Sequence, residues 1–133
     1  MSNITPQIHI EIDPAFFVFS SQKYWVKVPT LVSIDDKKQL VAIGEKVPTP
    51  GVTTIALFSL GQNPPDGVER LDLLQAFLEY NLSKMFEKQK LLVFRPKIIF
   101  HGEQQLNQIF CGYQRSLLEI AALAAGAKEV SFE

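Results

Sequence analysis

The last third of the chain most constrains what it can fold into. Apolar side chains recur every three or four residues from about Glu103 to Ala125, which is the period of an α-helix with one buried face. The recurring residues are Leu106, Ile109, Phe110, Tyr113, Leu117, Ile120, Ala121 and Ala124. Gly126 then provides a left-handed C-cap. Apolar strands over 97–100 and 129–132 flank this helix, so the segment predicts a right-handed crossover that adds a parallel strand to a sheet.

The front half has a different pattern, in which short β-rich runs are separated by tight turns. Isoleucines alternate with polar residues at its start, which is the period of a strand with one apolar face. Five strands are expected: Ile8–Ile12, Ala15–Phe19, Tyr24–Ile34 with a bend at Pro29, Gln39–Ile43, and Thr53–Leu60. Strands joined in this way form an antiparallel meander.

A second helical pattern lies between these two parts. Asp72 is a suitable N-cap, and the helix is expected to run to about Glu87, before another short apolar run at Leu91–Phe94. The order of elements predicts one α/β domain over residues 1–133, with a mixed sheet in which an antiparallel meander is followed by two crossover helices. We expect both helices to bury their apolar faces on the sheet. The large residues expected in that core are Phe77, Leu78, Ile109, Phe110, Leu117 and Ile120.

Composition and charge exclude several kinds of partner. The net charge is −1 and the Lys and Arg residues are scattered, so the chain has no electrostatic footprint for nucleic acid. No apolar stretch is long enough for a membrane span, and Met1–Pro6 lacks the character of a signal peptide. The single cysteine, Cys111, cannot form an internal disulfide or a zinc site. A reducing compartment fits best, so we expect a cytoplasmic protein.

Four stretches of the sequence carry a family resemblance. They are Ile10–Ile12; Val28–Asp35 with Val41–Glu45; Asp66–Val68 with Ala76–Tyr80; and Arg115 with Ala122–Val130. In this order and spacing they resemble the N-terminal part of the MreB family, the bacterial actin homologues that determine rod shape. The last stretch is the most specific, and together they extend from about residue 7 to 132. The resemblance implies the ribonuclease-H-like half-domain of the actin-like ATPases.

The first hairpin departs from the family at the positions that bind nucleotide. In the family this hairpin is a phosphate loop, in which an aspartate ends the first strand and Gly, Thr and Asn follow in the turn. The matching positions here are Glu11, Asp13, Pro14 and Phe16. Asp13 brings negative charge to the place of the phosphate, Pro14 removes an amide donor, and Phe16 replaces a polar group with a bulky apolar one. Against the family pattern, this degenerate loop implies no bound nucleotide and no other cofactor.

Two further departures from the family also argue against ATPase activity. The helix that the family carries after its fourth strand is missing, because Glu45 runs directly into the Pro/Gly-rich segment 46–51. The sequence also stops at Glu133, before the family's acidic residues that position the hydrolytic water and before its second phosphate loop. Compared with the family, the chain is expected to be a pseudo-ATPase at most, and not an enzyme.

Other candidate sites are weak when each is weighed against a structural role. Cys111 and His101 could form a thiol–imidazole pair, but a buried structural cysteine and a capping or loop histidine are the expected roles. Glu11 could bind a metal ion, but a single carboxylate on a strand usually faces solvent. His9 should point to the face opposite the isoleucines, and Trp25 should pack in the core. We expect no catalytic residue and no metal site.

The leading functional hypothesis is a non-catalytic, MreB-like protein-interaction module, linked to cell shape or the bacterial cytoskeleton. The chain is 47% hydrophobic with ten phenylalanines, which favours a buried surface beyond its own core. The expected partner is a second copy, giving a homodimer, or an MreB-type filament protein. The expected seams are the strand at Val130–Phe132 or the strand at Tyr24–Trp25, because uncovered strand edges invite pairing.

The alternative is a small ligand-binding protein or enzyme that reuses the crevice at the carboxyl ends of the strands. The two hypotheses differ in what lines that crevice. The interaction hypothesis expects Pro14, Phe16 and Phe17 to fill its wall, whereas the alternative expects an open polar pocket.

Overall fold

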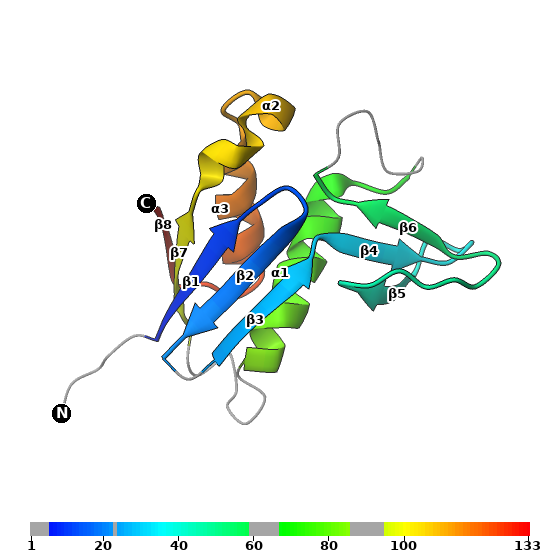
Figure 1. Cartoon of the computed structure of the whole chain (residues 1–133), viewed down its shortest axis with the longest axis horizontal. Helices are drawn as coiled ribbons and strands as arrows, with labels where there is room; N and C mark the ends of the chain where they lie inside the picture. Colours follow the sequence, from blue (N-terminus) through cyan, green and yellow to red (C-terminus); the bar gives the residue numbers. More distant parts are fainter. Residues whose placement is uncertain (1–5, 23, 59–66, 86–94) are drawn as a thin grey trace.

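The computed structural model describes residues 6–22, 24–58, 67–85 and 95–133, which form two sheets and a layer of helices (Figure 1). The strands are β1 (Gln7–Ile12), β2 (Phe16–Ser21), β3 (Tyr24–Pro29), β4 (Leu31–Ile34), β5 (Leu40–Ile43), β6 (Thr53–Ala56), β7 (Lys97–His101) and β8 (Glu129–Phe132). The helices are α1 (Arg70–Met85), the 3₁₀-helix η1 (Glu103–Leu106), α2 (Asn107–Phe110) and α3 (Gln114–Ala124).

The large sheet is mixed, as the sequence predicts, with the strand order β3-β2-β1-β7-β8. β1, β2 and β3 are antiparallel neighbours, and β7 and β8 are added in parallel beside β1. Ile8 lies opposite Ile98 and Ile10 lies opposite Phe100, so the apolar side chains of β1 and β7 share one face. Helices α1 and α3 cover that face (Figure 1). Its core includes Phe17 and the edge-to-face ring of Phe77, with centroids 5.7 Å apart.

The small sheet, with the order β5-β4-β6, corrects one predicted strand. The sequence predicts a single bent strand over Tyr24–Ile34. Instead, β3 ends at Pro29 and pairs with β2, whereas β4 begins at Leu31 and pairs with β5 and β6. Between them the amide of Thr30 donates to the carbonyl of Ala15 at 3.1 Å. Proline has no amide with which to continue a ladder, so the chain leaves the large sheet there and enters the small one.

The second predicted helix is not continuous. It begins as η1 and α2, stops at Cys111 and Gly112, and resumes as α3. The φ angles at these two residues are 51° and 94°, and a left-handed conformation of this kind ends a helix. The buried residues of α3 are Gln114, Leu118, Ala121 and Ala122. Because the break resets the helical phase, only Ala121 among them was predicted to be buried, and the predicted positions Tyr113 and Ala124 are exposed.

The shift in phase corrects part of the predicted core. Phe77 and Leu78 on α1 are fully buried, as predicted. Three further residues are only half-buried but do pack against the core: Ile109, Phe110 and Leu117. The prediction for Ile120 was wrong, because its side chain is 53% exposed. One turn of α3 therefore presents to solvent an apolar residue that the continuous helix would have buried.

The remaining boundaries differ only slightly from those predicted. α1 begins at Arg70, two residues before the expected N-cap, and β6 ends at Ala56. The predicted helix end at Glu87, the run Leu91–Phe94 and the last residues of the predicted strand over 53–60 lie outside the described residues. Residues 44–52, between β5 and β6, contain no helix, as expected. Where the chain is described, no helix is both long and apolar enough to cross a membrane.

Candidate functional site

In the turn of the first hairpin, between β1 and β2, the backbone amides donate hydrogen bonds to acceptors within the same turn. Asp13 N–H donates to the carbonyl of Phe16 at 3.0 Å, and Phe16 N–H donates back to the carbonyl of Asp13 at 3.2 Å. Ala15 N–H donates to Asp13 Oδ1 at 2.9 Å, which is an Asx-turn hydrogen bond. Pro14 has no amide hydrogen. Every amide donor of residues 13–16 is thus committed within the turn.

The carbonyls of the turn are held as well. Pro14 O accepts from Thr30 Oγ1 at 2.6 Å, and Ala15 O accepts from the amide of Thr30. Thr30 is almost completely buried, so it fixes the hairpin onto the point where β3 gives way to β4. A phosphate site needs several free N–H groups that converge on the anion. The turn as folded supplies none, and the carboxylate of Asp13 adds a negative charge.

The three residues expected to fill a crevice wall next to this turn differ in their burial. Phe17 is fully buried, and its ring lies against Phe58, with centroids 5.4 Å apart. Phe16 and Pro14 are half-buried. The ring of Phe16 is covered by the ammonium group of Lys27, whose Nζ lies 3.9 Å from the ring centroid. Phe16 and Phe17 are consecutive on β2, so their side chains lie on opposite faces of the sheet and do not share one wall.

The thiol–imidazole pair that the sequence suggested but did not favour is not formed. Cys111 is exposed at the end of α2, so the expectation of a buried cysteine was wrong. His101 lies at the end of β7, where its Nε2 contacts Nδ1 of His9 at 2.7 Å. Glu11, the carboxylate considered as a metal ligand, is exposed on β1. Trp25 is 67% exposed on β3, so the expectation of core packing was also wrong.

A buried polar cluster, which the sequence did not reveal, joins the start of α3 to η1. Glu103 is buried, and its carboxylate accepts hydrogen bonds from Gln114 Nε2 and Arg115 Nε, each at 2.8 Å. Gln114 Nε2 also donates a hydrogen bond to Asn107 Oδ1, and Gln114 Oε1 accepts one from the amide of Gly112 at 2.9 Å. Gln114 therefore holds the break between α2 and α3 in place. Burial raises the pKa of Glu103, but the hydrogen bonds from Arg115 and Gln114 outweigh it and hold that pKa below its ordinary value.

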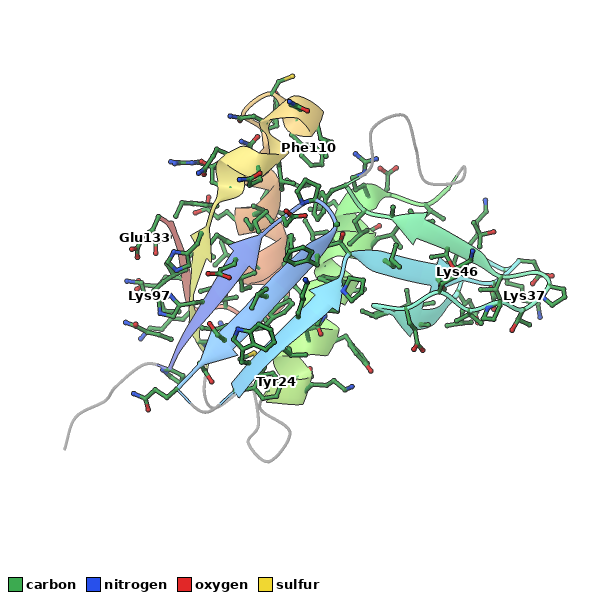
Figure 2. The ribbon with its side chains drawn as sticks, viewed as in Figure 1. Tyr24, Lys37, Lys46, Lys97, Phe110 and Glu133 are labelled. Carbon is green, nitrogen blue, oxygen red and sulfur yellow. The ribbon has the colours of Figure 1, made fainter. Side chains whose placement is uncertain are left out.

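The outer side of α3 and its N-cap residue carry large apolar side chains that are exposed to solvent. We call Tyr113, Leu117, Ile120 and Leu123 the α3 apolar surface; Tyr113, Ile120 and Leu123 are 76%, 53% and 46% exposed, and Leu117 is the half-buried member that joins this surface to the core. A groove of about 560 Å³ runs beside it, between α3 and the start of α1. Its lining includes the apolar residues Val68, Leu71, Phe110 and Leu117 and the charged residues Glu69 and Arg70. Figure 2 shows Phe110 on the side of α2 that faces the start of α1.

The two strands predicted as dimer seams both form edges of the large sheet. β3 closes one side of the sheet and β8 closes the other. On β8 the ring of Phe132 lies against Phe100, with centroids 5.5 Å apart, and is only half-buried. Beside β3 a second groove of about 430 Å³ separates this strand from β5, with Tyr80 and Lys84 of α1 in its lining. Tyr24 stands at the start of β3, next to that groove (Figure 2).

Comparison with known proteins bears on this architecture. No protein-family model matches the sequence, and no curated protein is similar to it in sequence. Among solved structures, MreB 5 of Spiroplasma citri bound to AMPPNP superposes with a TM-score of 0.64 and 17% sequence identity. The superposition covers 99% of this chain and 39% of the MreB 5 chain. The chain has the fold of an MreB half-domain.

The likeness to MreB confirms the actin-like α/β fold that the four sequence stretches implied. It extends over almost the whole of this chain, and this chain spans about two fifths of MreB 5. At 17% identity the likeness concerns the fold. The nucleotide analogue belongs to MreB 5, and what the matching hairpin of this chain can bind depends on its own residues.

Proposed function

We propose that this protein is a non-catalytic, MreB-like module that acts by protein contact, in a role linked to cell shape or the bacterial cytoskeleton. The observation that carries the proposal is the α3 apolar surface and its adjoining groove. Three large apolar side chains, Tyr113, Ile120 and Leu123, are exposed on one helix face. Apolar surface gathered in this way marks sites of protein contact in soluble domains.

The hairpin supports the non-catalytic part of the proposal. Binding of a nucleotide phosphate would require Ala15 and Phe16 to give up the amide hydrogen bonds that they make to Asp13. It would also bring the phosphate toward the carboxylate of Asp13. Both changes cost free energy, and neither is offset by a free donor among residues 13–16.

The favoured partner is a second copy of the chain. Protruding side chains and a groove lie next to one another in a single patch, which includes Tyr113 and Ile120 as well as Phe110 and Leu117. A two-fold axis through such a patch places the projecting residues of each copy over the groove of the other. The net charge of −1 offers little repulsion to oppose this contact. A filament-forming protein of the actin-like class is the other occupant that this fold suggests.

Light scattering and analytical ultracentrifugation over micromolar concentrations test the self-association. The wild-type chain should show a dimer mass at the upper concentrations, and Ile120→Asp should shift it to the monomer because it buries a charge in the contact. Glu119→Gln on the same helix is the matched control and should leave the dimer intact. A monomer mass at every concentration would exclude the homodimer. A dimer that survives Ile120→Asp but is lost in Trp25→Lys would move the seam to the edge strand β3.

Calorimetry with Mg²⁺–ATP tests the non-catalytic assignment independently. The untagged chain should give no heat of binding and no phosphate release, because the hairpin offers no free amide donors. A dissociation constant in the micromolar range would contradict the assignment, whatever the oligomeric state. The oligomeric state reports on the α3 apolar surface, and ATP binding reports on the first hairpin. A negative result in one measurement therefore does not affect the interpretation of the other.

A further inference from the structure

The sequence contains two histidines, and the fold brings them into contact on the face of the large sheet opposite the helices. His9 on β1 and His101 on β7 are 92 residues apart in sequence, yet His9 Nδ1 lies 2.7 Å from His101 Nε2. The ring centroids are 5.0 Å apart and the ring planes differ by 23°. With nearly parallel planes, these two distances require the rings to meet edge to edge. The facing nitrogens therefore direct their ring-plane orbitals toward one another.

Two adjacent strands hold this pair in place. β1 and β7 are parallel neighbours near the middle of the sheet, and His9 lies opposite Ile99 in their register. Both imidazoles are half-buried, so their freedom to move apart is limited while each ring keeps one edge near solvent. Neutral imidazole is the commonest metal ligand in proteins. Two imidazole nitrogens that already face one another from adjacent strands supply two neighbouring ligands for a metal ion.

The distances decide what such a site would require. Zinc–nitrogen bonds are about 2.0–2.1 Å, so two histidines on a tetrahedral ion have nitrogens about 3.3 Å apart. The observed separation suits one N–H···N hydrogen bond along the line that joins the two rings. To admit a tetrahedral ion, the nitrogens must part by roughly 0.6 Å and each ring must turn by about 35° so that both nitrogens face a common point. The ring that donates this hydrogen bond must also change tautomer. Its proton moves to its outer nitrogen, both facing nitrogens then present lone pairs, and each imidazole stays neutral.

One oxygen donor, Glu11, lies beside His101 on the neighbouring strand. Glu11 is the direct register partner of His101, and both side chains lie on the face opposite the helices. Glu11 is exposed, so its carboxylate is free to rotate toward an ion beside His101. In the described ranges no three His, Cys, Asp or Glu side chains are already gathered around one point. The ion would thus be held by two imidazoles, with Glu11 and water in the remaining positions.

We propose that His9 and His101 form a surface site for a divalent transition-metal ion of the Zn²⁺, Ni²⁺ and Cu²⁺ class, with Glu11 as its nearest oxygen donor. The imidazole donors favour these ions over Mg²⁺ and Ca²⁺, which prefer oxygen ligands. Affinity should follow the order Cu²⁺ above Ni²⁺ and Zn²⁺. The site does not depend on the hairpin or on the α3 apolar surface, and it is independent of the proposed interaction function.

Calorimetry of the untagged chain with the chloride salts of Zn²⁺, Ni²⁺ and Cu²⁺ tests the proposal. We expect one ion per chain with a dissociation constant in the micromolar range, and no binding of Mg²⁺. His9→Gln and His101→Gln should each weaken binding at least tenfold, because each leaves a single imidazole. Glu11→Gln should weaken it several-fold. Cys111→Ser is the matched control, since it removes the one thiol of the chain, and it should leave the affinity unchanged.

Nitrogen-15 spectra of the wild-type imidazoles give a readout that needs no variant to fold. On addition of Zn²⁺ the signals of His9 Nδ1 and His101 Nε2 should both shift, and the tautomer of one ring should change. Imidazole signals that stay in place at millimolar metal would overturn the proposal. So would undiminished binding in a folded His9→Gln protein, or binding that is lost in Cys111→Ser alone.

Discussion

The inner and outer faces of α3 are both apolar, but only one of them is covered. The inner face carries Leu118, Ala121 and Ala122, which are fully buried where α3 packs against α1. The outer face carries Tyr113 and Ile120, which are more than half exposed. Small alanines on the inner face allow the two helices to approach closely, whereas the outer residues are large. An apolar residue on this helix therefore contributes to the fold on one face and remains available for a partner on the other.

The largest expected effect comes from truncating the inner face. Leu118→Ala removes a fully buried side chain and leaves a cavity, so it should lower the free energy of unfolding by about 2–5 kcal/mol. Urea denaturation followed by circular dichroism measures this change.

The matched substitution on the outer face is Ile120→Ala. Its side chain is already half in water, so the loss should stay below about 0.5 kcal/mol for the dilute monomer. Equal losses in the two variants would remove the distinction between the faces.

The same comparison explains how much of the fold could be predicted from the sequence. Periodicity located the β-rich runs and the two helical regions, because alternation and the 3.6-residue repeat reflect local burial. It did not show that the run Tyr24–Ile34 divides between two sheets. It could not locate the break at Cys111 and Gly112, since a helix with apolar residues on two faces has the same pattern whether or not it is interrupted. The positive φ angles at these two residues set the phase of α3. In the sequence, the glycine at position 112 was the one sign that the helix is interrupted there.

Some features of the candidate site could be predicted from the sequence and others could not. That few amide donors of the first hairpin would be free could be argued from Asp13 and Pro14, because their chemistry acts within the turn itself. The contact of His9 with His101 could not be predicted, because it depends on the parallel register of strands that are 92 residues apart. The exposure of Trp25 was missed because a strand pattern does not reveal which strand lies at an edge.

The cluster at Glu103 tests how the inner face is anchored. Its pKa is held below the ordinary value of 4.5, so the ionised carboxylate stabilises the fold above that pH and this contribution is lost as the pH falls below it. Glu103→Gln should cost on the order of 1 kcal/mol at pH 7, a modest value because Arg115 is largely exposed.

The stability of Glu103→Gln should also fall less steeply than that of the wild type between about pH 5 and 3, which acid titration of the unfolding free energy would reveal. Glu119→Gln, on the exposed side of α3, controls for the lost charge. Identical pH profiles for Glu103→Gln and the wild type would mean that the cluster does not anchor the inner face.

The smallest effect on the isolated monomer is expected at Leu123, on the outer face. Leu123→Gln removes an apolar side chain that is already 46% exposed, so the unfolding free energy at low concentration should change by less than about 0.5 kcal/mol. At high concentration the two proteins should differ, because binding that favours the folded state raises its stability by mass action. The melting temperature of the wild type should therefore rise with protein concentration, and that of Leu123→Gln should not. If the melting temperature of the wild type does not change with concentration, the outer face does not bind a second copy, and its partner would have to be a different protein.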